Sequence, residues 1–290
     1  MRVMILRCGA PQFLLPHGPE SNWEILDCAV VPTRKELKAV DAAAREILPA
    51  DPTPSLDEIA AQPDVAHLDA PAPAPQPVPE ALRVVVIGTD AALSAVITRL
   101  MRADTMWVEV AYVPVEDSSA AAQNWGLPQQ ADDAFRLALD GAVAPVPTIR
   151  NDAGQAVAGS ATISQWNPGA MTGEIIVDDH VLVRQDGDAL RGAHTGVYGA
   201  KLVPMVDAPG IVAAAAPVAR QGLLERLRRK QAAPQPGPVD PSTVATGRAV
   251  QAGGPELRVT VDGVSRPRPV DRVTFYRHLR DLQVVRVARP

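Results

Sequence analysis

The chain has 290 residues, of which 47% are apolar and only 3% aromatic, so it can bury a core built from Val, Ala, Leu and Ile. The formal net charge of −5 argues against a nucleic-acid surface along the chain, and we expect no nucleic-acid partner. No window approaches the roughly 20 apolar residues of a membrane span, and the apolar run at the start is too short for a signal peptide. We therefore expect a cytoplasmic protein.

The first part of the chain predicts a strand and a helix. Residues 3–6 are a short apolar run typical of a strand, and RKELKAVDAAAREI, residues 34–47, predicts a helix. Cys8 and Cys28 are the only cysteines, and we expect them to be free thiols. With His17 they offer three metal-ligating side chains, but their spacing matches no zinc pattern, so we expect no metal there.

The clearest unit follows a Pro/Ala-rich stretch, DAPAPAPQPVPE at residues 69–80, which predicts an extended linker or surface loop. Residues 84–87 predict a buried strand, and the apolar stripe of the next segment, residues 91–101, predicts a helix that packs on a sheet. MWVEVAYVPV, residues 106–115, predicts the next strand. Strand, helix and strand in about 30 residues form a βαβ unit with parallel strands.

The turn in this unit, GTDA at residues 88–91, has the outline of a phosphate loop. A strand, a glycine and a helix N-terminus together make a common cradle for phosphate, yet only Gly88 is present. Asp90 has two roles open to it: N-cap of the helix that begins at Ala91, or a residual contact to nucleotide.

From about residue 127 the pattern changes to short Val/Ile runs separated by turn residues, which predicts an all-β domain, a sandwich or a barrel. The alternation of apolar and polar residues over 257–262 predicts a half-buried strand. Two segments of this region do not have the strand pattern. Residues 221–231 predict a short basic helix, and residues 231–247, rich in Pro, predict a mobile loop.

Several polar clusters outside these elements are candidate sites, each with a structural alternative. Asp178-Asp179-His180 offers metal ligands, but a turn between strands is favoured because consecutive strand residues face opposite sides. His194 and Tyr198 lie in a Gly-rich segment that lines a cleft or forms a loop. Asp186-Gly187-Asp188 favours a hairpin turn.

Two basic clusters are also present, and anion binding is the alternative role for both. The first favours a solvated helix face and consists of Arg226, Arg228, Arg229 and Lys230. The second favours pairing with carboxylates and consists of Arg266, Arg268, Arg272, Arg277 and Arg280, near Tyr276 and His278.

Three motifs follow one another in a characteristic order: GTDAA at 88–92, VPVEDSSAAAQNWGLP at 113–128 and VDGV at 261–264. In this order the chain resembles the diacylglycerol kinase catalytic-domain family, bacterial lipid kinases related to sphingosine and NAD kinases. That family carries Gly-Gly-Asp-Gly-Thr, then Gly-Thr-x-Asn-Asp-Phe-Ala followed by Leu-Gly-Ile-Pro, and Asp-Gly-Glu near the end. The resemblance spans about residues 80–260.

Carried over by position, the first motif keeps Gly88 and Asp90, the family's nucleotide-contacting positions. Its other two glycines and its threonine are replaced. A glycine lets backbone N–H groups approach phosphate oxygens without a Cβ in the way, so these replacements obstruct a phosphate cradle. The replacements are Thr89, Ala91 and Ala92.

In the second and third motifs the structural positions match the family, whereas the phosphate-contacting and catalytic positions are replaced. Glu116, Asp117 and Ser119 stand where the family has Gly, Thr and Asn, and two like charges a few ångströms apart cost about 1–4 kcal/mol. Asp262 is retained, but the family's glutamate, its general base, has become Val264, which cannot take a proton. Scaffold positions that match the family are Pro114, Ala122, Gly126, Pro128 and Gly263.

The resemblance implies an α/β plus all-β fold: an NAD-kinase-like α/β domain over residues 1–126 and a β-sandwich-like domain over 127–290, whose last residues pack back on the first. It implies a degenerate lipid-kinase-like protein that binds a ligand or partner in the interdomain cleft. Two alternatives stay open. One is an active lipid kinase that uses ATP and Mg²⁺, with Gly88 and Asp90 at the nucleotide and Asp262 orienting the base; the other is a structural subunit that mediates oligomerisation. The partners implied are a lipid or small molecule, a peripheral membrane contact and a second copy of the chain.

Overall fold

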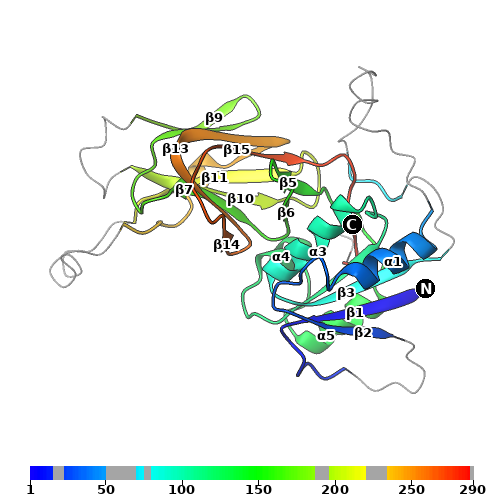
Figure 1. Cartoon of the computed structure of the whole chain (residues 1–290). Helices are drawn as coiled ribbons and strands as arrows, with labels where there is room; N and C mark the ends of the chain where they lie inside the picture. Colours follow the sequence, from blue (N-terminus) through cyan, green and yellow to red (C-terminus); the bar gives the residue numbers. More distant parts are fainter. Residues whose placement is uncertain (16–22, 50–69, 75–79, 187–195, 220–233, 288–290) are drawn as a thin grey trace, which may run out of the picture.

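The computed structural model describes residues 1–15, 23–49, 70–74, 80–186, 196–219 and 234–287. These residues form an α/β lobe and an all-β lobe, each built around its own sheet (Figure 1). The predicted fold class, α/β plus all-β, is therefore confirmed. None of the helices in the described part of the chain has the length and apolar run that crossing a bilayer requires.

The first sheet has five strands, all parallel to their neighbours. In spatial order they are β16 (Gln283–Val284), β4 (Glu109–Pro114), β3 (Leu82–Gly88), β1 (Arg2–Cys8) and β2 (Glu24–Cys28). The central strands are buried on both faces, as parallel sheets require. The chain runs from β1 to one edge of the sheet and then returns to the other side of β1. The crevice outside the carboxyl ends of β1 and β3 is thus a topological switch point, where ligands of α/β folds commonly bind.

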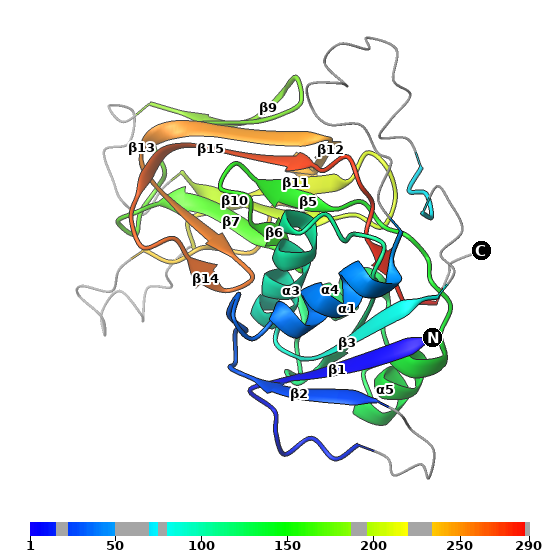
Figure 2. The same cartoon turned by 45° about the vertical axis from the view of Figure 1, so that its right-hand side comes forward.

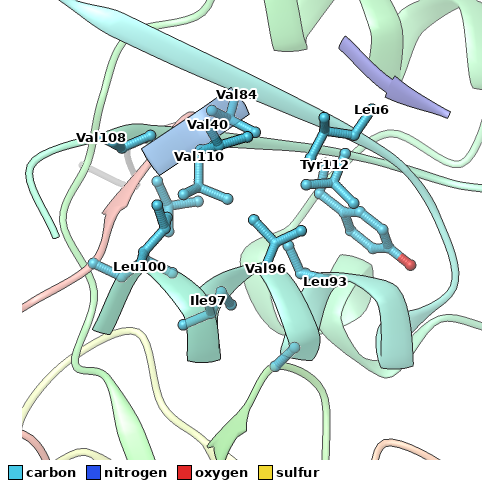
Figure 3. Packing of buried hydrophobic residues seen from close by; sticks show 14 of the residues in the cluster. Leu6, Val40, Val84, Leu93, Val96, Ile97, Leu100, Val108, Val110 and Tyr112 are labelled. Carbon is cyan, nitrogen blue, oxygen red and sulfur yellow. The ribbon is translucent and has the colours of Figure 1, made fainter. Parts of the chain in front are cut away.

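Helices cover both faces of this sheet. The helices α1 (Lys38–Ile47), α3 (Asp90–Arg102) and α4 (Ala120–Trp125) share one core with the sheet, and α5 (Ala131–Asp140) packs on the opposite face. Figure 2 shows α1 and α3 together on one side of the sheet, above β3 and β1 in this view. In Figure 3, Val96 and Leu100 of α3 point toward Val84 and Val110, so the apolar stripe read from the sequence is the face that is buried.

The second sheet has eleven strands and encloses a separate core. The long strand β13 (Ala249–Val261) joins its parts: its first half pairs with β8 and β15, and its second half pairs with β7 and β14. The predicted alternation in this strand is confirmed, because Leu257, Val259 and Val261 are at most 1% exposed. The other strands are β5 (Ile149–Asn151), β6 (Ala156–Val157), β7 (Ala161–Gln165), β8 (Gly173–Val177), β9 (His180–Gln185), β10 (Val197–Pro204), β11 (Ile211–Pro217), β12 (Ala245–Gly247), β14 (Val264–Ser265) and β15 (Val270–Arg277).

Three local expectations differ from the structure. Helix α5 lies within the region expected to be all-β; acidic residues in its first turn and the burial of Phe135 against the first sheet stabilise it there. Strand β2 was not expected, since it is a short edge strand with an exposed side. Residues 234–247 are not a free loop, because backbone groups of Gly237 and Asp240 hydrogen-bond to β11 and β12 pairs with it.

Other expectations fall partly outside the described residues. These include the basic segment with Arg226, Arg228, Arg229 and Lys230, residues 187–195 with His194, and His17. Asp178 forms the predicted turn between β8 and β9, where its carboxylate accepts hydrogen bonds from the backbone of Arg248 and Ala249. Pairing with carboxylates is also confirmed for three of the C-terminal arginines: Arg266 with Asp152, Arg277 with Asp281 and Arg280 with Asp104.

Candidate functional site

The turn after β3 has no room for a side chain at position 88, so glycine is required there. A Cβ on Gly88 would lie 2.9 Å from Cβ of Cys8 and 3.1 Å from Cβ of Ala92. The predicted N-cap was wrong by one residue: Thr89 is the cap of α3, and its hydroxyl accepts a hydrogen bond from Ala92 N at 3.3 Å. Asp90 is therefore free to turn away from its own helix.

Asp90 instead binds the start of α4. Its Oδ2 accepts from the backbone N–H groups of Ala120 and Ala121 at 2.9 and 3.2 Å, and its Oδ1 accepts from the Ser119 hydroxyl at 2.5 Å. The Tyr112 hydroxyl lies 3.0 Å from the same oxygen. Burial, followed by the charge of Asp90, raises the pKa of Tyr112 above its ordinary value, so this hydroxyl stays a donor. The carboxylate is thus saturated by four donors.

Asp262 is saturated in a similar way on the other lobe. It lies in the turn between β13 and β14, with φ of 48°, and is 9% exposed. Its carboxylate accepts from the backbone N–H groups of Ala158, Gly159 and Ser160 at 2.7–2.8 Å. Burial raises the pKa of Asp262 to about 6, although the three N–H groups lower it.

This pKa predicts a pH dependence of stability. The unfolded carboxyl has a pKa of about 3.9, so the folded chain holds the proton more tightly, and this contribution to stability is lost as the pH rises through 6. Between pH 5 and 7.5 the free energy of unfolding should fall by about 1.4 kcal/mol on account of Asp262. Urea denaturation at the two pH values measures this, and Asp262→Asn should remove that part of the change. An unchanged pH dependence in the variant would contradict the assignment.

Gly159 connects the two aspartates. A Cβ at this position would lie 2.5 Å from Oδ2 of Asp90 and 2.8 Å from Ala121 N, while its own N–H donates to Asp262. Asn124 of α4 donates to Gly159 O at 2.8 Å. The two retained aspartates therefore meet across one backbone segment and hold the lobes against each other. This junction was not predicted, because no side-chain motif marks residues 158–160.

A large cavity lies at the carboxyl end of the first sheet. It has a volume of about 1090 Å³ and is bounded by the segments after β1 and β4 and by the connection from α4 to α5. Its carboxylates are Glu116, Asp117 and Asp132, and no Lys or Arg lies among the described residues that bound it. Glu116 and Asp117, which the resemblance places at phosphate-contacting positions, bound this cavity, whereas Gly88 and Asp90 do not. All of its bounding residues belong to the first lobe.

A smaller cavity of about 320 Å³ lies between the lobes. α3 and the segment before α1 bound it on one side, and Val261 and Val264 of the all-β lobe bound it on the other. Val264, which the resemblance places at the position of the family's base, is 48% exposed. Arg34 and Arg102 are the cations beside it, together with Arg99, which is paired with Asp41.

No family model and no curated protein sequence matches this chain. Solved structures do: a diacylglycerol kinase from Bacillus anthracis str. Sterne superimposes with a TM-score of 0.58 at 11% identity, covering 99% of this chain and 97% of that one. A putative diacylglycerol kinase from the same organism gives 0.55 at 11% identity, with the same coverage. An NAD kinase from Archaeoglobus fulgidus in complex with ATP gives 0.43 at 12% identity, covering 99% and 94%. The chain therefore has the fold of the bacterial diacylglycerol kinases, an α/β lobe followed by an all-β lobe.

Proposed function

We propose that this chain is a degenerate lipid-kinase-like protein that binds a ligand between its lobes and does not transfer phosphate. The observation that carries the absence of phosphate transfer is the acidic lining of the larger cavity, where Glu116 and Asp117 stand at the family's phosphate-contacting positions and no cation lies among the described bounding residues. A triphosphate would meet like charges there, at a cost of about 1–4 kcal/mol for each close pair.

The residues present do not fit Mg²⁺ and ATP. Asp90 and Asp262 are the carboxylates that the resemblance retains, and their oxygens already accept four and three hydrogen bonds. Val264 offers no atom that takes a proton from a lipid hydroxyl. These features support binding without catalysis over the active-kinase alternative.

The interlobe cavity suggests the class of ligand. Its wall combines apolar side chains, such as Val261 and Val264, with the guanidinium groups of Arg34 and Arg102. This combination favours a lipid or small molecule that carries an apolar part and a negative group. We propose a cytoplasmic location for this binding; a homodimer and a peripheral membrane contact are secondary proposals, which light scattering and vesicle sedimentation test.

Ligand-dependent thermal shift and calorimetry test the proposal. We expect no stabilisation by millimolar MgATP, whereas a ligand at 100 times its dissociation constant would add about 2.7 kcal/mol. A Glu116→Gln/Asp117→Asn variant should bind ATP at least about tenfold more tightly than the wild type, because about 1.4 kcal/mol of repulsion is removed. Asp271→Asn, on the exposed side of β15, is the matched control and should change nothing.

Two results would contradict the proposal. One is stabilisation of the wild type by MgATP, and the other is transfer of labelled phosphate to diacylglycerol. A short-chain phosphatidic acid is the probe for the interlobe cavity; its binding should weaken in Arg34→Gln. If this probe does not bind, the proposed class of ligand is wrong. The proposed loss of phosphoryl transfer is then still decided by the MgATP and labelled-phosphate experiments.

A further inference from the structure

The two cysteines end neighbouring strands side by side. In the parallel pairing of β1 with β2, Cys8 is directly opposite Cys28, one position after the pair Arg7 and Asp27. Arg7 holds this register with two hydrogen bonds to the Asp27 carboxylate, at 2.6 and 2.8 Å. Because opposite residues of paired strands point to the same face, the two thiols share one face of the sheet.

Their packing keeps the thiols together. Each sulfur donates to the carbonyl two residues earlier, Cys8 to Leu6 at 3.8 Å and Cys28 to Leu26 at 3.9 Å, so the side chains have matching orientations. Both lie against the core that α1 and α3 cover. Neighbouring strands are about 4.8 Å apart, which lies within the roughly 4.4–6.8 Å between Cα atoms that a disulfide spans.

The two thiols differ in access and in acidity. Cys8 is 1% exposed, whereas Cys28 is only partly buried. The neighbouring Cys8 thiol lowers the pKa of Cys28, against burial and the carboxylates of Glu36 and Asp27, which raise it. An accessible, more acidic thiol beside a buried one is the arrangement of an attacking and a resolving cysteine.

We infer that Cys8 and Cys28 form a reversible disulfide driven by hydrogen peroxide. The Cys28 thiolate attacks one peroxide oxygen and the O–O bond breaks, which gives a sulfenic acid and a hydroxide ion; the hydroxide takes up the proton that the Cys28 thiol lost on ionising and leaves as water. The Cys8 thiol then attacks the sulfenic sulfur; the S–S bond forms, the S–O bond breaks and a second water leaves. The two thiols supply the two electrons that reduce the peroxide.

This inference goes beyond the proposed function and does not depend on it. A bond between the ends of β1 and β2 would join the edge strand to the centre of the sheet. Cys8 packs against Gly88, and Ala10 bounds the larger cavity, so the bond would lie next to the candidate site. Oxidation of Cys8 and Cys28 would therefore modify the protein at the sheet edge, next to the candidate site.

Thiol titration and peptide mapping of the full chain test the inference. With a small excess of hydrogen peroxide, the wild type should fall from two titratable thiols to none, and dithiothreitol should restore both. Digestion should yield one cross-linked pair of peptides that contain Cys8 and Cys28, from a chain that stays monomeric on a non-reducing gel. Cys8→Ser should accumulate a sulfenic acid on Cys28 that dimedone traps, and Cys28→Ser should keep its one thiol.

Other outcomes overturn the inference. They are two thiols that survive peroxide treatment sufficient to oxidise glutathione, a disulfide found only between chains, or sulfinic acid on Cys28 of the wild type without a cross-link. The wild-type measurements decide these cases even if one of the serine variants fails to fold.

Discussion

Asp90→Ala should lower the free energy of unfolding by about 4 kcal/mol. The change leaves the N–H groups of Ala120 and Ala121 and the buried hydroxyl of Ser119 without their acceptor, and each buried unsatisfied group costs about 1–3 kcal/mol. The Tyr112 hydroxyl keeps Gly88 O, at 3.0 Å, as a second acceptor. Urea denaturation measures the loss.

The same experiment separates a structural role of Asp90 from a role in nucleotide binding. Trp125 ends α4 and its ring lies 6.3 Å from that of Tyr112, so its fluorescence should report a loosened α4 in the folded variant. Asp117→Ala, on the exposed wall of the larger cavity, is the matched control and should stay within about 0.5 kcal/mol of the wild type. A variant with unchanged stability and unchanged fluorescence would show that α4 does not depend on Asp90.

The sequence predicts the first lobe better than the contacts of its site. Apolar runs such as 84–87 and the stripe of α3 report burial directly, so β3, α3 and β4 are confirmed where the pattern expects them. Cap assignment depends on which oxygen turns back toward the helix: the sequence predicts Asp90 as the cap, whereas the structure gives that role to Thr89. Only the position of α4, a tertiary feature, decides between them.

The sequence predicts the acidic residues of the larger cavity but not the backbone contacts of the interlobe junction. Motif order places Glu116 and Asp117 beside the phosphate positions, and the structure brings both to one cavity wall. The three N–H groups at 158–160 leave no trace in the sequence, because backbone donors are present at nearly every residue. Their convergence on Asp262 depends on how β7 pairs with β13, over contacts about 100 residues apart in the chain.

The junction also gives a physical reason for the part of the third motif that is retained. The Asp262 carboxylate holds three N–H groups, and Gly263 adopts φ of 81°, a conformation that favours glycine. Both positions therefore serve folding. The side chain of Val264 is about half exposed and accepts no comparable set of hydrogen bonds, so the turn places no such requirement on the residue at position 264.

Asp262→Ala should accordingly destabilise the chain, by about 3 kcal/mol at neutral pH. The variant loses the acceptor of three backbone N–H groups, of which those of Ala158 and Gly159 are buried. Removal of a buried charge offsets part of this loss, so we expect a smaller effect than for Asp90→Ala.

The loss should also be larger near pH 5 than at pH 7.5, because the wild type is more stable at the lower pH. Asp271→Ala, exposed on β15, is the control, and urea denaturation at both pH values is the measurement. A catalytic remnant with no structural role would leave stability untouched at either pH. A loss of the predicted size and pH trend would instead show that this carboxylate stabilises the turn between β13 and β14 through the three backbone N–H groups it accepts from.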